Sequence, residues 1–161
     1  MRMSVGENMW YDPEVKNFLM LDVMDEIPVQ HTQVIDGVEL VPKEDFHVTL
    51  VAAGKIAASA AQADELIAKI ARYVREHSHK VAFIGLDDVR YVCRDGDEMT
   101  LIAPARVSGV EKLLEIVREM IPDARPPFLH VTLAKNTASP YGIGVHSVED
   151  LRKYCESVQC K

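Results

Sequence analysis

The sequence His-Val-Thr-Leu occurs twice in this chain, at His47–Leu50 and again at His130–Leu133. Each copy lies in an apolar run rich in β-branched side chains, which predicts strands over residues 46–52 and 128–134. Side chains two positions apart in a strand point to the same side. Each copy therefore presents one imidazole and one hydroxyl on one face and apolar side chains on the other. The question for the fold is whether the two polar faces meet in one site.

The composition is that of a single folded, acidic domain. Hydrophobic residues make up 48% of the 161 residues and the net charge is −7, which excludes a disordered chain and argues against binding of an extended nucleic-acid duplex. No apolar run approaches a membrane span, and no signal peptide follows Met1. Cys93, Cys155 and Cys160 are odd in number and suggest no disulfide framework, so we expect reduced structural thiols. We therefore expect a cytoplasmic protein that has no contact with membranes. We also expect a monomer, although no sequence feature determines the oligomeric state.

Periodicity and turn signals predict the other elements. Strands are expected over residues 16–23, 31–41 (a short strand or hairpin), 80–86, 89–93 and 99–103. Helices are expected over residues 59–76, from 108 to about 121, and over about 148–157. Capping boxes at Ser59 and Ser108, a helix cap at Ser147 and a hairpin turn at Asp95-Gly96 agree with these bounds. The order of elements predicts an α+β fold with mainly antiparallel sheet.

The paired motif resembles the two-histidine phosphoesterase superfamily, which includes 2′-5′ RNA ligase-like proteins and cyclic nucleotide phosphodiesterases. That family carries two His-x-Thr/Ser-x motifs, one in each lobe, which match His47–Leu50 and His130–Leu133. The lead-in at residues 41–46 and the exit at Gly54 are also similar, and the resemblance covers about residues 16–135. It implies one bilobal domain over residues 1–161, with pseudo-symmetric lobes of about 1–78 and 79–161, helices outside and a central cleft.

The same resemblance implies a metal-independent phosphoesterase without cofactors. Its partner would be a nucleotide or RNA end that carries a 2′,3′-cyclic or 2′-5′ linked phosphate. His47 and His130 would serve as general acid and base, in an order that the sequence leaves open. Thr49 and Thr132 would donate hydrogen bonds to the phosphate oxygens. Because an ordinary histidine titrates near ~6.5, one ring can be neutral and the other protonated near neutral pH.

Two features depart from the family pattern. Many relatives have a helix before the first motif, whereas residues 24–45 are broken by Pro28, Asp36-Gly37 and Pro42. Many RNA ligase-like members also have Arg where Lys135 stands, and lysine keeps the charge but lacks the bidentate fork. We expect Lys135 and Phe46 to contact the substrate.

Other residues have simpler explanations. His77 and His79 lack a closed ligand set, so no metal site is expected. Residues 141–144, Tyr-Gly-Ile-Gly, predict a turn and not a dinucleotide loop. Surface, loop or packing positions are expected for His31, His146, Trp10 and Tyr11, although an aromatic ring could stack on a base. Two alternatives stay open: a nucleotide- or RNA-end-binding module of the same fold without catalysis, and an α+β domain in which the histidines are coincidental.

Overall fold

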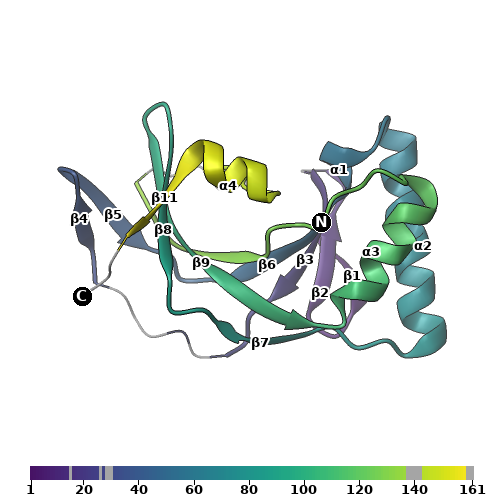
Figure 1. Cartoon of the computed structure of the whole chain (residues 1–161). Helices are drawn as coiled ribbons and strands as arrows, with labels where there is room; N and C mark the ends of the chain where they lie inside the picture. Colours follow the sequence, from purple (N-terminus) through teal and green to yellow (C-terminus); the bar gives the residue numbers. More distant parts are fainter. Residues whose placement is uncertain (15, 26, 28–30, 137–142, 159–161) are drawn as a thin grey trace.

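A computed structural model describes residues 1–14, 16–25, 27, 31–136 and 143–158 (Figure 1). Its strands are β1 (Met3–Gly6), β2 (Met9–Asp12), β3 (Lys16–Asp22), β4 (Gln33–Ile35), β5 (Val38–Pro42), β6 (His47–Ala52), β7 (Ala82–Leu86), β8 (Arg90–Asp95), β9 (Glu98–Ser108), β10 (His130–Lys135) and β11 (Cys155–Val158). Its helices are α1 (Ala53–Ile56), α2 (Ala60–His77), α3 (Val110–Met120) and α4 (Val148–Tyr154). The predicted α+β class with a mostly antiparallel sheet is confirmed.

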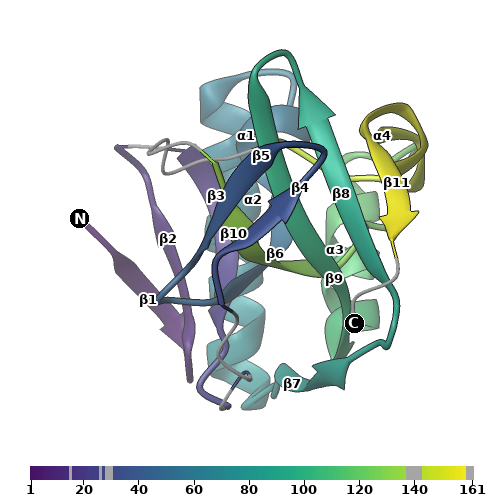
Figure 2. The ribbon, with the colours of Figure 1, turned by 90° about the vertical axis from the view of Figure 1, so that its left-hand side faces the viewer.

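The sheet places the two histidine strands side by side. Its main path runs β1-β2-β3-β6-β10-β9-β8-β11, so the strands before β6 come from the first half of the chain and those after β10 from the second (Figure 2). Off this path, β4 pairs with β5, β5 with the end of β10, and β7 with β9. The predicted division into two pseudo-symmetric lobes stays a prediction, but the two halves of the chain meet in the sheet where β10 pairs with β6 and with β5.

Helices cover the two faces of the sheet unequally. In Figure 2, α2 and α3 lie together behind the strands, whereas α4 lies at the β11 edge. Along β9, Leu101 and Ala103 belong to the main hydrophobic core, while Ile102 belongs to a second cluster with Ile143 and Val145. Since neighbouring residues of a strand point to opposite faces, this alternation separates a face packed on α2 and α3 from a face packed on α4. The main core is therefore on the side away from α4.

Two of the predicted helix caps are present. Ser59 Oγ accepts a hydrogen bond from the Gln62 N–H at 3.1 Å at the start of α2. The Gln62 side chain accepts from the Ala58 N–H at 2.6 Å, one residue before the position that a capping box predicts. Ser147 caps α4, which ends at Tyr154 and not near residue 157 as expected.

The predicted cap of α3 is wrong. Strand β9 continues through Ser108, so that residue is in the sheet, and Gly109 is the N-cap instead. Gly109 has φ +85°, a left-handed conformation that glycine adopts without steric cost. A Cβ there would lie 2.1 Å from the Lys80 carbonyl oxygen. The apolar run at residues 99–103 indicated the strand but not its continuation through residues 104–108, where Pro104, Arg106 and Ser108 interrupt the run.

Strand β11 overturns the prediction of reduced cysteines. It pairs antiparallel with β8 and places Cys155 opposite Cys93, where the two form a disulfide. These residues are 62 positions apart. The sequence pattern predicted a helix over most of β11, so the pairing of the two cysteines could not be predicted. The expectation of a cytoplasmic location rested partly on reduced cysteines. The disulfide removes that support, because stable disulfides occur mainly in oxidising compartments. Cys160 lies outside the described residues.

The remaining expectations have mixed outcomes. The hairpin expected within residues 31–41 is present as β4 and β5, whereas β1, β2 and α1 were not predicted. The β8–β9 turn is shifted by one residue, since Asp95 pairs with Glu98 around Gly96. The loop expected at residues 139–142 lies outside the described residues. Among the helices of the described part of the chain, none is long and apolar enough to cross a membrane.

Candidate functional site

Strands β6 and β10 bring the two motifs together. They pair antiparallel with Val48 opposite Val131, and both valine side chains are 0% exposed in the main core. Because side chains alternate along a strand, the histidine and threonine of each motif point to the opposite face. The antiparallel register puts each histidine beside the threonine of the other strand. The two copies therefore form a compact set of two imidazoles and two hydroxyls.

This polar set lines a single cavity of about 350 Å³, here called the histidine cavity, whose lining includes His47, Thr49, His130 and Thr132. All four residues are half-buried. Side chains of β2 and β3 and the segment 143–146 supply most of the other walls. The structure thus brings together the four residues for which the sequence predicted catalytic roles.

The ring of His130 is oriented by Phe128. His130 Nδ1 lies 2.9 Å from the Phe128 carbonyl oxygen, and the two rings stack with centroids 5.6 Å apart. Since a carbonyl oxygen only accepts hydrogen bonds, we assign the ring proton to Nδ1, which leaves Nε2 as the proton acceptor of the neutral ring. Burial lowers the pKa of His130, and the bond to Phe128 opposes that effect in part.

The surroundings of His47 are charged. Burial lowers the pKa of His47 to about 4, the positive charge of Lys43 adds to that effect, and the Asp22 carboxylate opposes it. Asp22 lies opposite His47 in the β3–β6 ladder. Trp10 meets the His47 ring edge-to-face at 6.4 Å between centroids and donates from Nε1 to Asp22 Oδ1 at 2.8 Å.

The protein groups thus keep both histidine rings neutral at pH 7. The sequence-based expectation of one neutral and one protonated ring is not met by these groups alone, because burial disfavours the charged form of both imidazoles. A bound phosphate would act in the opposite direction, since a negative charge within a few ångströms raises the pKa of a histidine. Protonation of one ring is therefore expected to accompany the binding of an anion.

Thr49 has a weak hydrogen-bond partner. Its Oγ1 donates to the Met20 sulfur at 3.2 Å. A thioether is a poor acceptor compared with a phosphate oxygen, so the hydroxyl can turn toward a stronger acceptor at little cost. The contact keeps the hydroxyl oriented in the histidine cavity without binding it tightly.

The two expected substrate contacts, Lys135 and Phe46, are not among the described residues that line the histidine cavity. Lys135 lies at the end of β10, opposite Val41 of β5, where its charge helps to lower the pKa of the half-buried Lys43. Phe46 packs against the main core and lines a neighbouring cavity that also contacts His47.

Sequence reasoning missed several residues of the histidine cavity, among them Arg2 and His146. Arg2 lines it from the segment before β1, and no local pattern distinguishes this arginine from a surface residue. His146 was expected on a surface or loop and does lie in a loop, but it also lines the cavity and meets the Phe18 ring edge-to-face at 5.2 Å. Both depend on contacts between segments far apart in the chain.

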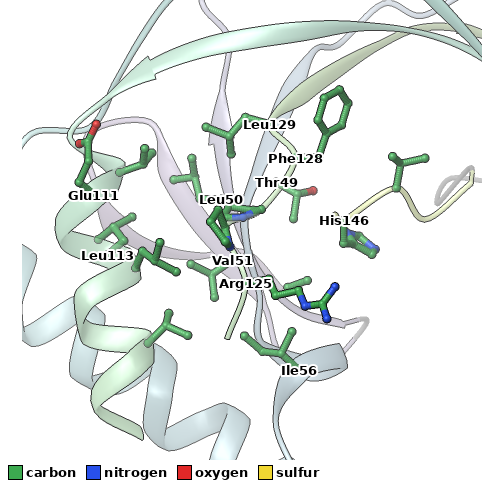
Figure 3. A pocket seen from close by; sticks show the side chains of 17 residues that line it. Thr49, Leu50, Val51, Ile56, Glu111, Leu113, Arg125, Phe128, Leu129 and His146 are labelled. Carbon is green, nitrogen blue, oxygen red and sulfur yellow. The ribbon is translucent and has the colours of Figure 1, made fainter. Parts of the chain in front are cut away.

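A second, mostly apolar cavity of about 230 Å³ adjoins the first. The two share Thr49, Val145 and His146 in their linings. Figure 3 shows this second cavity, with Leu50 and Leu113 on its apolar wall and Thr49 and His146 beside it. The space beside the histidine cavity on the side of α3 is therefore lined mainly by apolar side chains, which suit uncharged groups.

The remaining histidine pair makes ordinary structural contacts. The His77 ring stacks on Tyr73 with centroids 4.2 Å apart, and His79 Nε2 lies 2.7 Å from the Gly109 carbonyl oxygen. Within the ranges that the structure describes, no group of three or more His, Cys, Asp or Glu side chains could hold a metal ion.

Comparison with known proteins leaves the family open. No protein-family model, no curated protein and no solved structure matches the chain. The two-histidine family therefore stays a prediction from the paired motifs. The arrangement of side chains in the histidine cavity is the basis on which a function can be argued.

Proposed function

We propose that the protein is a metal-independent phosphoesterase that acts on 2′,3′-cyclic phosphates or 2′-5′ linkages of nucleotides or RNA ends. One observation carries the proposal: two histidines and two threonines, His47, Thr49, His130 and Thr132, line one cavity from adjacent strands. The cavity volume of about 350 Å³ is within the range of small-molecule sites. Paired imidazoles can both remove and supply a proton, as phosphodiester cleavage requires.

The surroundings of the rings suggest how the roles divide. In hydrolysis, His130 Nε2 would remove a proton from water as the water oxygen forms a new bond to phosphorus. His47 would donate its proton to the ribose oxygen as the bond between that oxygen and phosphorus breaks. Asp22 favours the charged form of His47, as a general acid needs. In the reverse reaction, ligation, the roles would be exchanged.

The threonines would stabilise the charge that develops on phosphate. Hydroxyl donors aimed at the non-bridging oxygens lower the barrier when they are already oriented before reaction. Thr49 could reach this orientation on substrate binding, because its present acceptor, the Met20 sulfur, is weak and is readily exchanged for a phosphate oxygen. Thr132 would contribute the equivalent donor from β10.

The partner that fits this proposal is a small nucleotide or the end of an RNA chain. A net charge of −7 disfavours an extended nucleic-acid duplex, whose binding needs a basic face. The monomeric state and cytoplasmic location that we expect remain predictions.

The test is hydrolysis of nucleoside 2′,3′-cyclic monophosphates and of short RNA with a cyclic phosphate end. His47→Ala and His130→Ala should each lower turnover by roughly 10²–10⁴-fold, the usual contribution of general acid–base catalysis. His31→Ala is the matched control, because His31 is exposed and does not line the histidine cavity. Circular dichroism would establish that all variants fold.

Equal rates for the wild type and both cavity variants would overturn the proposal. Nucleotide binding by the wild type without any turnover would instead select the binding module of the same fold.

A further inference from the structure

We propose that Arg2 binds the anionic phosphate oxygens of the substrate, in the role that the family resemblance implies for position 135. The inference deepens the proposed function and rests on it. It adds the segment before β1 to a site that the sequence placed entirely on β6 and β10. The ligand class is a phosphate ester with anionic oxygens.

The β1–β2 hairpin positions Arg2 at the histidine cavity. Strands β1 and β2 form an antiparallel hairpin with Ser4 opposite Trp10. Continuing this alternation by two residues puts Arg2 on the same face as Trp10. Arg2 lines the histidine cavity and also the neighbouring cavity on the other side of His47. Among the described residues lining the histidine cavity, Arg2 is the only lysine or arginine.

Arg2 is held in place by Trp10 and Asp22. Its guanidinium carbon lies 3.8 Å from the centroid of the Trp10 ring, a cation–π contact. Its NH1 lies 3.8 Å from Asp22 Oδ2, while Trp10 Nε1 donates to the other oxygen of the same carboxylate. These three side chains form a connected group beside His47.

Arginine chemistry suits the role. A guanidinium presents five N–H donors in a planar fork that matches two oxygens of a phosphate. The ion pair with Asp22 is longer than a hydrogen bond, so phosphate oxygens can compete for the same donors. The Trp10 ring covers one face of the guanidinium and leaves its edge as the binding surface.

Lys135 lies elsewhere. It stands at the far end of β10 from His130, opposite Thr100 of β9, and is not among the described residues lining the histidine cavity. A cation that contacts the substrate in the histidine cavity would therefore come from another segment. Arg2 supplies one from the β1 edge of the sheet.

The main experiment separates substrate binding from chemistry. Arg2→Ala should raise the KM for a nucleoside 2′,3′-cyclic monophosphate by about 10- to 100-fold, the usual effect of losing hydrogen bonds to a charged group, with a smaller change in kcat. Arg2→Lys should lie between Arg2→Ala and the wild type, because it keeps the charge and loses the fork. Arg106→Ala is the matched control: its side chain is 62% exposed, against 61% for Arg2, and it forms a comparable 3.6 Å ion pair with Asp87.

A second measurement does not depend on turnover. Inorganic phosphate is titrated into the wild type and Arg2→Ala while the His47 ring is followed by NMR. Arg2→Ala should weaken phosphate binding by at least about 10-fold and should raise the pKa of His47, since Arg2 helps to lower it. Trp10→Leu alone should weaken phosphate binding. It should weaken binding little further when combined with Arg2→Ala, because both substitutions disrupt the same cation–π pair.

The outcomes distinguish the two proposals. If the wild type hydrolyses cyclic phosphates and Arg2→Ala leaves both KM and phosphate affinity unchanged, the role of Arg2 is overturned and the proposed function stands. If the wild type binds phosphate through Arg2 but hydrolyses nothing, the phosphoesterase activity fails and the anion site stands. A wild type that neither binds phosphate nor hydrolyses the esters overturns both.

Discussion

The two His-Val-Thr-Leu strands have identical sequences and different surroundings. On β10, the His130 ring is bonded to the Phe128 carbonyl and stacked on the Phe128 ring. On β6, the charges of Lys43 and Asp22 act on His47, and the edge of Trp10 faces its ring. The His130 ring is thus oriented mainly by Phe128, two residues earlier in the chain. The His47 ring is instead influenced by the charges of Lys43 and Asp22.

This difference shows that the two halves of the site need not be chemically equivalent. The bond to Phe128 specifies which nitrogen of His130 accepts a proton, which suits a general base. The carboxylate beside His47 favours its protonated form, which suits a general acid once a phosphate offsets the effect of burial. Substitutions on the two strands should reveal this asymmetry.

The largest effect should come from replacing each histidine and comparing pH profiles. His130→Gln and His47→Gln should each lower kcat by roughly 10²–10⁴-fold. Loss of the base should remove the ascending limb of the pH–rate profile, and loss of the acid should remove the descending limb. Rates from pH 4 to 10 check this, and the same limb missing in both variants would contradict the assigned roles.

The next effect concerns stability in acid. The pKa of His47 is lowered from 6.5 to about 4 in the folded protein, so between these values the unfolded chain binds a proton that the folded protein does not. Stability should therefore fall as the pH drops from about 6.5 to about 4, by up to about 3 kcal/mol.

Urea unfolding at several pH values measures this loss. It should be smaller in His47→Gln, which has no proton to bind at that position. An identical pH dependence in the variant would show that other groups cause it.

Removal of one hydroxyl should have a comparable or smaller effect on catalysis. Thr49→Val keeps the shape of the side chain and removes a donor, so kcat should fall by about 10²-fold, as for loss of one oxyanion donor. Thr132→Val should behave similarly if the two strands contribute equally. Steady-state kinetics with a nucleoside 2′,3′-cyclic monophosphate compare Thr49→Val with Thr132→Val. An unchanged kcat in both variants would show that the threonines have no role in the mechanism.

The smallest effect is expected at Lys135. Because Lys135 is outside the described lining of the histidine cavity, Lys135→Ala should change KM by no more than about 2-fold, as for an ordinary surface substitution. A rise in KM as large as that expected for Arg2→Ala would restore the role that the family resemblance implies for Lys135.

Much of the fold could be predicted because its signals are local. The apolar spacing that indicated α2 reappears as the buried side chains of Leu66, Ile67 and Ile70, and the break noted at Asp36-Gly37 coincides with the turn between β4 and β5. The missed strands β1, β2 and β11 are only four residues long each. Such short segments are ordered by pairing with neighbouring strands, which no local pattern reveals.

The two imidazoles and two hydroxyls of the site could be identified from the sequence alone. The alternation within each His-Val-Thr-Leu copy puts a histidine and a threonine on one face and apolar anchors on the other, because this alternation is a property of the strand alone. Tertiary structure was needed to show that β6 and β10 are neighbours, that Arg2 and not Lys135 is in the described lining of the cavity, and that Cys93 meets Cys155. It also decided the proton affinities of His47 and His130, since burial and nearby charges depend on segments that are distant in the chain.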